Sequence, residues 1–502
     1  MPILESLADR IGGTRLDAGG ATVAALQQAL AAGSLTSAAL TAFYLERISR
    51  LNPELRAVIA VSGEARDQAA AADQAITAGQ ATGPLAGIPV LIKDNVAVSG
   101  LPGTAGSPAL AAAESGDAHL VGRLRAAGAV IIGKANLSEW ANFRSSRSSS
   151  GWSTLGGQAV NPHGAGRNPS GSSSGSGVAV AAALTPLAIG TETDGSIVSP
   201  SSACGVVGIK PTLGLVSRGG IVPISAAQDT AGPMARCVAD AAALLGVIAG
   251  TDPADPATAD ADAHLADYTG SLDPAALAGA RLGVWRESSE AATPATAAVL
   301  DAAIETLRRC GAEVVDPVEL PGAGQIHEPE FTALRYEFKH DLGAYLAGLP
   351  GEHPADLAAL IAYNTAHADR VLAHFGQELF EQAQATAGLT DPAYAEARDA
   401  ARRLASGALD SALTSHRLDA VISLTTGPAW LTDHVLGDRH DFGTSSPAAV
   451  SGYPAVCVPA GEVRGLPVGI SFAGPAWSEP RLVALAYAFE QARSAGSGRA
   501  QR

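Results

Sequence analysis

The chain has 502 residues, of which 47% are hydrophobic and 16% charged, so it holds enough apolar material for a large core. Lys and Arg number 33 against 49 Asp and Glu. The resulting net charge of −16 repels phosphate backbones and anionic membranes, which argues against nucleic acid or a membrane as a partner. Four widely spaced cysteines without a CxxC pattern predict neither a zinc site nor a disulfide framework.

The N-terminus has no basic stretch followed by an apolar one, and no apolar run reaches the roughly 18 residues of a membrane-spanning helix. We therefore expect a cytoplasmic protein. A secreted or periplasmic location stays open if a signal peptide has been removed.

Helical and strand-like patterns alternate along most of the chain. Apolar residues recur with the helical period over residues 22–51, and we expect further helices at 64–78, 119–127, 178–184 and 480–493. Short apolar runs predict strands at 56–61, 87–92, 129–132, 186–190, 206–209, 281–285, 313–315, 419–424, 455–459 and 467–472. This alternation predicts an α/β fold with a single large mixed, mostly parallel sheet sandwiched by helices.

The pattern changes between about 325 and 415, where amphipathic helices replace the strand-like runs. We interpret this segment as a helical insertion that covers the functional site. In a single domain spanning residues 1–502, it would follow N-terminal helices at about 1–55 and a core at about 56–250.

The Ser/Gly-rich stretch 145–177 has the composition of a flexible linker, but it leads directly into an apolar helix. Within it, residues 171–175 match GxSxG, which is typical of a nucleophile elbow with Ser173 as the attacking residue. The residues before it form a poor strand, whereas such an elbow follows one. His434 or His440 would supply the histidine in the right chain order, so an esterase built on Ser173 stays open.

A second candidate serine follows the predicted strand at 186–190. The sequence TETDGSI places Ser196 just beyond the strand end, behind a glycine that permits a tight turn. The backbone N–H groups of Thr193, Asp194 and Gly195 would then form an oxyanion hole. Taken alone, a Gly-Ser pair after a strand is more often a simple turn.

Lys93 closes the apolar strand GIPVLI. On the surface, such a lysine would extend its charged end into water. If it is buried, desolvation lowers the pKa of Lys93 and leaves a neutral amine that can activate a serine without histidine.

In this order and spacing, the segments resemble the amidase signature family. The matching stretches are GIPVLIKDN at 87–95, GSSSGS at 171–176, GTETDGSI at 190–197, GVVGIKP at 205–211 and DTAGP at 229–233. Many members have Gly-Gly-Ser-Ile-Arg around the nucleophile, whereas this chain has Asp194 and Val198 at the first and last of these positions.

The resemblance implies a role for each residue of a Ser–Ser–Lys triad. Ser196 is expected to be the nucleophile that forms the acyl-enzyme, and Lys93 the base. Ser172 would relay the proton between them, with a cis peptide bond to Gly171, and Ser173 would be a supporting hydrogen-bond partner. No histidine, cofactor or metal takes part.

The TETDGSIV version, together with NLSEWANF at 136–143 and GWS at 151–153, is most similar to the peptide amidases. These enzymes hydrolyse the C-terminal amide of peptides and release ammonia, so we expect a small-molecule or peptide amide substrate and a monomer or homodimer. By position, Asn142, Phe143 and Trp152 are the expected pocket residues. A broad aryl or alkyl amidase or esterase of the same family is one alternative, and a subunit of a tRNA-dependent amidotransferase is another.

A last cluster contains acidic and histidine side chains: Asp433, His434, Asp438, His440 and Asp441. We interpret it as a solvated loop rather than a metal site, because no HExxH pattern accompanies it. The chain also lacks GxxxxGK[ST] and a GxGxxG context, so no nucleotide cofactor is expected.

Overall fold

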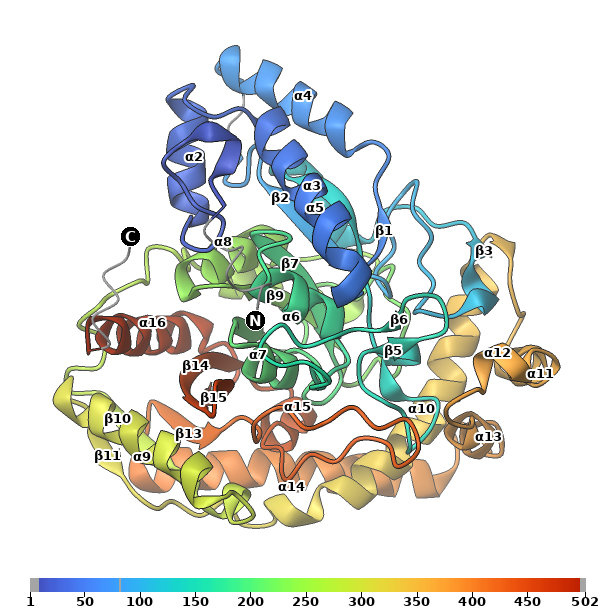
Figure 1. Ribbon diagram of the computed structural model, residues 1–502. Helices are drawn as coiled ribbons and strands as arrows, with labels where there is room; N and C mark the ends of the chain where they lie inside the picture. Colours follow the sequence, from blue (N-terminus) through green and yellow to red (C-terminus); the bar gives the residue numbers. More distant parts are fainter. Residues whose placement is uncertain (1–8, 81–82, 497–502) are drawn as a thin grey trace.

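The computed structural model describes residues 9–80 and 83–496, and its centre is one eleven-stranded sheet (Figure 1). Strand β2 pairs in parallel with β4 and β7, and β10 pairs in parallel with β11 and β13, while the other neighbours are antiparallel. The large mixed sheet predicted from the alternating pattern is confirmed. In spatial order it comprises β1 (Val58–Val61), β4 (Val130–Ala135), β2 (Pro89–Lys93), β7 (Leu187–Glu192), β9 (Thr230–Ala235), β8 (Val207–Lys210), β14 (Ala455–Val463), β15 (Leu466–Ala473), β13 (Ala420–Leu424), β10 (Arg281–Val284) and β11 (Glu313–Val315).

Strand β9 was not predicted, because its sequence TAGPMA contains Gly232 and Pro233 and proline is rarely found in a central strand. In the sheet, Pro233 lies opposite Ile189 of β7. A Cβ on Gly232 would lie 2.0 Å from the carbonyl oxygen of Ile209, so only glycine fits this close approach between strands.

Helices cover both faces of the sheet, as alternate residues of β14 illustrate. Ala455 and Cys457 pack in the cluster that contains α14, whereas Val456 and Val458 pack in the main core with α9 and α16. Of the expected N-terminal helical segment, residues 1–8 lie outside the described part. The helices of this layer structure are α2 (Val23–Ala31), α3 (Ser37–Leu55), α4 (Ala65–Thr77), α5 (His119–Ala126), α6 (Ser174–Ala181), α7 (Val198–Cys204), α8 (Val238–Ile248), α9 (Pro294–Arg309), α15 (Ser446–Ser451) and α16 (Glu479–Gly496).

The helical insertion near 325–415 is confirmed. It comprises α10 (His327–Gly348), α11 (Leu357–Ala366), α12 (Ala368–Val371), α13 (Glu378–Gln384) and α14 (Pro392–His416). A separate apolar cluster joins it to the loop after β4, where Phe143 lies 5.0 Å from Phe338 between ring centroids. The gold and orange helices of Figure 1 therefore pack beside the loops that follow the central strands.

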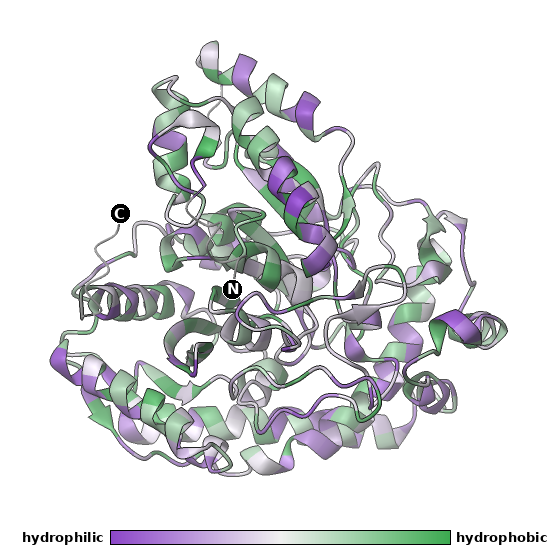
Figure 2. Ribbon diagram, viewed as in Figure 1, coloured by the Kyte–Doolittle hydropathy of each residue, from purple (hydrophilic) through white to green (hydrophobic). Residues whose placement is uncertain are grey.

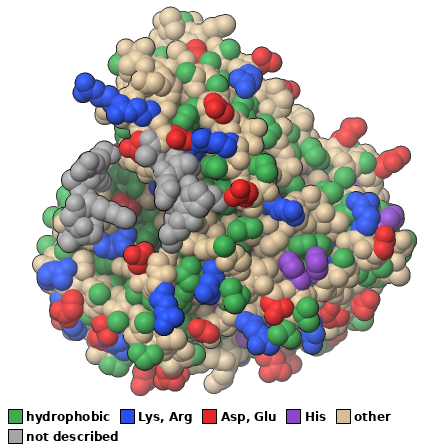
Figure 3. Space-filling view, viewed as in Figure 1, with side chains coloured by type: hydrophobic (Ala, Val, Ile, Leu, Met, Phe, Trp, Pro, Cys, Tyr) green, Lys and Arg blue, Asp and Glu red, His purple; other side chains and the backbone are tan. Residues whose placement is uncertain are grey.

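Apolar residues concentrate on the strands and the central helices, while the outer helices carry many hydrophilic positions (Figure 2). On the face shown in Figure 3, basic and acidic side chains are interspersed rather than gathered into a basic patch. Among the described residues, no helix is long and apolar enough to cross a membrane.

Candidate active site

Two parallel strands bring the predicted residues to one edge of the sheet. In the β2–β7 ladder, Val90 lies opposite Leu187 and Ile92 opposite Ile189. Lys93 is the last residue of β2, and β7 ends one residue beyond Thr191. The carboxyl ends of parallel strands meet at the same edge, so the loop that follows β7 begins beside Lys93.

Lys93 is fully buried and surrounded by hydroxyl groups. Its Nζ lies 2.8 Å from Ser172 Oγ, 2.9 Å from Ser173 Oγ and 2.8 Å from Thr191 Oγ1. Within the described chain, the buried Lys134 has the carboxylate of Asp94 at 3.5 Å, whereas Lys93 has no such partner. A neutral amine at this position can accept a proton from a neighbouring hydroxyl.

Burial lowers the pKa of Lys93 to about 7, and the negative charges of Glu192 and Asp229 offset only part of this effect. Lys210, which is also buried, has its pKa lowered by burial to about 8. Because the pKa of Lys93 is about 7, a large fraction of its side chain is neutral near physiological pH. It meets the first requirement for a general base, a pKa close to the working pH.

The serines beside Lys93 lie at the start of α6. The peptide bond between Gly171 and Ser172 is cis, as the resemblance implied. A Cβ on Gly175 would lie 2.3 Å from the backbone oxygen of Asn136. Glycine at this position thus allows α6 to approach the end of β4 and brings Ser172 to Lys93.

Ser196 lies in the tight turn between β7 and α7. Gly195 before it has a φ of 78°, a conformation that favours glycine. After it, Glu192 Oε2 accepts hydrogen bonds from the N–H groups of Ile197 and the next residue, at 2.7 and 3.0 Å. The Ser173 N–H donates to the carbonyl oxygen of Ser196 at 3.1 Å, which holds the two serine segments side by side.

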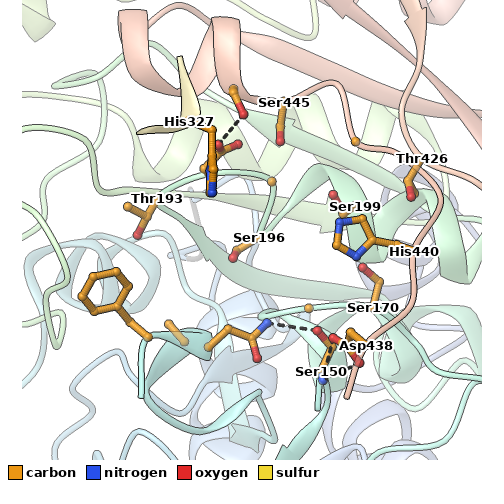
Figure 4. Close-up of a pocket in the computed structure, with 18 of the residues that line it drawn as sticks. Ser150, Ser170, Thr193, Ser196, Ser199, His327, Thr426, Asp438, His440 and Ser445 are labelled. Carbon is orange, nitrogen blue, oxygen red and sulfur yellow. Dashed lines mark hydrogen bonds between the residues drawn. The ribbon is translucent and has the colours of Figure 1, made fainter. Parts of the chain in front are cut away.

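Ser196 borders a cavity of about 500 Å³ (Figure 4). It is 9% exposed, whereas Lys93, Ser172 and Ser173 are 0% exposed. Of these four side chains, Ser196 alone lines the cavity. A substrate in the cavity would therefore meet Ser196, with the other three groups behind it.

Thr193, Asp194 and Gly195 line the same cavity. The backbone N–H groups of Asp194, Gly195 and Ser196 have no acceptor within the part of the chain that the structure describes. A negatively charged oxygen that develops on a substrate attacked by Ser196 would provide this acceptor.

Asn142 and Phe143 also line the cavity, as predicted from their position. Asn142 Nδ2 donates to Ser150 Oγ at 3.0 Å, while its Oδ1 is buried and accepts no hydrogen bond from the described residues. The ring of Phe143 packs against Phe331 and Phe338 of α10, at 6.0 and 5.0 Å between centroids.

Trp152 lies apart from the cavity lining. Its ring packs edge-on against His374 and Phe375, each at 5.1 Å between centroids, and the guanidinium of Arg144 lies 5.5 Å from it. These contacts anchor its loop to the helical insertion, so the structure gives no reason to place Trp152 in the substrate pocket.

Several lining residues were missed from the sequence, including two from the Asp/His cluster. Asp438 and His440 line the cavity beside Trp430. The segment is a loop in which His440 is exposed, and it also borders the cavity, which its polar sequence did not indicate. Asp438 accepts hydrogen bonds from the Ser150 N–H at 2.9 Å and Trp430 Nε1 at 3.2 Å. Figure 4 shows His440 and Asp438 on one side of Ser196 and His327 on the other.

The environment of Ser173 does not match a nucleophile elbow. Its Oγ accepts hydrogen bonds from Lys93 Nζ and the Thr191 N–H and donates to the Thr191 carbonyl oxygen. His434 stacks on His374 at 4.2 Å between centroids, and neither His434 nor His440 is hydrogen-bonded to Ser173. Within the described residues, no group of three or more His, Cys, Asp or Glu side chains could hold a metal ion.

Comparisons with known proteins agree with this geometry. The family model "Amidase" matches residues 39–483. A probable amidase of Arabidopsis thaliana is 42% identical over 94% of this chain and 90% of its own length. The A subunit of the glutamyl-tRNA(Gln) amidotransferase of a Synechococcus species is 35% identical over 94% and 97%.

Among solved structures, the native peptide amidase of Stenotrophomonas maltophilia is 52% identical, with a TM-score of 0.89 and coverage of 94% of this chain and 96% of its own. The family match spans most of the chain, and the fold is that of a solved peptide amidase. The protein therefore belongs to the amidase signature family and is an amidase.

Proposed function

We propose that this amidase cleaves carboxamides through a Ser–Ser–Lys triad, with Ser196 as nucleophile, Ser172 as relay and Lys93 as base. The observation that carries this proposal is the buried Lys93, whose pKa burial lowers to about 7 and whose Nζ lies 2.8 Å from Ser172 Oγ. Such an amine can receive a proton from Ser172 while Ser172 takes one from Ser196.

In the first half of the reaction, Ser196 Oγ attacks the amide carbonyl carbon and its proton passes through Ser172 to Lys93. The carbonyl oxygen becomes an oxyanion facing the N–H groups around Asp194 and Gly195. When the tetrahedral intermediate collapses, the proton returns from Lys93 through Ser172 to the leaving nitrogen. Ammonia departs, and an ester between the acyl group and Ser196 remains.

In the second half, water attacks this ester and gives a proton to the same relay. Collapse of the second intermediate breaks the bond to Ser196 Oγ, which takes the proton back. The product is a carboxylic acid, which is ionised at neutral pH. Two steps with one relay thus complete the hydrolysis of the amide to a carboxylate and ammonia.

The C-terminal amide of a peptide is the substrate that the cavity favours. Among the described residues that line it there is no lysine or arginine, while Asp194 and Asp438 are acidic. A substrate that carries a carboxylate into the cavity, as free glutamine would with its α-carboxylate, would find no lysine or arginine partner among these residues. A peptide amide has no such carboxylate. The 52% identity with a peptide amidase supports the same choice.

The test is ammonia release by the purified chain from blocked dipeptide amides, free glutamine, anilides and esters. Rapid release from the peptide amides, lost in Ser196→Ala, is the expected result. If anilides or esters are cleaved faster, the proposed substrate is not a peptide amide but a broader class of aryl or alkyl amides and esters. Turnover that appears only with partner proteins would favour the amidotransferase alternative. The similarity to the A subunit of a glutamyl-tRNA(Gln) amidotransferase supports that alternative.

A further inference from the structure

A pair of carboxyl groups joins the loop after β7 to the helical insertion. Asp194 follows β7, and Glu330, which is 3% exposed, lies in the first turn of α10. The two carboxyl groups lie close enough to act directly on each other. Because two ionised carboxylates have no hydrogen to donate, a hydrogen bond within the pair requires one shared proton.

The remaining contacts of Asp194 are consistent with this shared proton. Its Oδ2 accepts a hydrogen bond from Ser446 Oγ at 2.6 Å. Its Oδ1 is buried, and the hydroxyl group of Ser445 is a second side-chain partner of this carboxyl group. A proton carried by Glu330 would add a third donor to these two hydroxyl groups.

Glu330 also reaches the neighbouring residue, Thr193, through a glutamine. Gln228 Nε2 donates to Glu330 Oε1 at 2.6 Å and to the carbonyl oxygen of Thr193 at 2.9 Å. The other end of this amide, Gln228 Oε1, accepts a hydrogen bond from Arg398 of α14 at 2.9 Å. Gln228 is therefore held at both ends, and its position fixes that of Thr193.

We propose that Glu330 is a positioning residue for the oxyanion-binding segment, holding Asp194 through the shared proton and Thr193 through Gln228. This inference rests on the proposed function of that segment. It assigns a role in the reaction to the helical insertion, which supplies Glu330 from α10 and Arg398 from α14. Without Glu330, the N–H groups around Asp194 would lose their fixed direction toward the cavity.

The charges around the pair determine how it responds to pH. Burial raises the pKa of both carboxyl groups, and the charge of Asp194 raises the pKa of Glu330 further. The charged or titratable groups that act on the pair are His327 on α10, Arg398 on α14, Glu192 on β7 and Lys210 on β8. Removal of the shared proton at alkaline pH leaves two adjacent carboxylates that repel each other. Activity should then fall on the alkaline side, whereas protonation of Lys93 lowers it on the acid side.

Two substitutions separate a positioning role from a purely structural one. In Glu330→Gln, the amide group donates permanently to Asp194 and its oxygen still accepts from Gln228. We expect kcat near neutral pH within about threefold of wild type and no alkaline fall. In Glu330→Leu both contacts disappear, and we expect kcat to drop about 10- to 100-fold with little change in KM. Glu328→Gln makes the same chemical change on an exposed residue of α10 and is the matched control.

The measurement is the pH dependence of kcat and KM, with whichever amide or ester the wild type hydrolyses fastest. A wild-type alkaline fall that persists in Glu330→Gln would overturn the inference, as would wild-type kcat in a folded Glu330→Leu. If Glu330→Leu does not fold, the pH profile of Glu330→Gln decides alone. Full activity in Ser196→Ala, measured in parallel, would count against the proposed triad, whereas the Glu330 variants test only the positioning role.

Discussion

Replacement of Lys93 by methionine removes the base but keeps a side chain of similar length. Burial lowers the pKa of Lys93 from 10.5 to about 7. At about 1.4 kcal/mol per pH unit, this means that folding disfavours the charged ammonium by roughly 5 kcal/mol. Lys93→Met removes this cost and also loses the hydrogen bonds to Ser172, Ser173 and Thr191, at about 1 kcal/mol each. The variant should therefore be inactive, and more stable than wild type by a few kcal/mol at pH 6.

The pH dependence of this difference is the sharper prediction. Between about pH 7 and 10.5 the unfolded chain keeps a proton on Lys93 that the folded chain has lost. Wild-type stability therefore rises with pH in this window, by about 1.4 kcal/mol per unit from this group. Methionine does not titrate, so the advantage of Lys93→Met should shrink by roughly 2 kcal/mol between pH 7 and 9.

Urea denaturation of both proteins at several pH values between 6 and 9, with ammonia release measured in parallel, tests the reasoning. Lys134→Met is the matched control, because Lys134 is equally buried but has Asp94 at 3.5 Å. Its removal leaves a buried carboxylate unpaired and should destabilise the protein by about 3–5 kcal/mol. An active Lys93→Met variant, or a stability difference independent of pH, would refute the assignment of a neutral, buried base.

Three further substitutions test the surroundings of the nucleophile. Ser173→Ala should lower kcat about 10- to 100-fold without abolishing turnover, because the Ser173 hydroxyl supports the site. Complete loss of activity, with an intact Lys93 environment, would favour Ser173 as the nucleophile. In Gly195→Ala, the alanine has to adopt the left-handed conformation of Gly195, and its Cβ would lie 2.8 Å from Ser445 Oγ. We expect kcat to fall at least about 100-fold in steady-state assays. An unchanged kcat would show that this turn does not bind the oxyanion. Glu192→Ala removes the acceptor of the Ile197 N–H and should lower the free energy of unfolding by about 3–5 kcal/mol. An unchanged Tm in thermal unfolding would contradict this prediction.

Much of the candidate site could be predicted because each segment reports on its own local structure. Lys93 closes an apolar run that is necessarily a buried strand, and Ser196 follows another with a glycine at the turn. Ser172 precedes a helix of small residues that is buried along its whole length. Their order along the chain then identified the family.

The parts of the fold and of the site that were not predicted depend on contacts between segments that are far apart in the sequence, which the local sequence pattern does not show. Strand β9 contains Pro233 and was missed for that reason. The pair of Asp194 and Glu330 joins a strand end to a helix of the insertion, and neither residue is unusual in its own segment. Asp438 and His440 were interpreted only as part of a solvated loop because their segment is polar, and tertiary packing in addition places both in the cavity lining.

The central claim, that Ser196 carries the acyl group, is tested most directly by labelling with a fluorophosphonate that reacts with activated serines. Mass spectrometry with fragmentation of the labelled peptide locates the adduct among the serines of residues 168–218. We predict one adduct on Ser196, which disappears in Ser196→Ala and in Lys93→Met. An adduct on Ser173, or undiminished labelling in Lys93→Met, would contradict it.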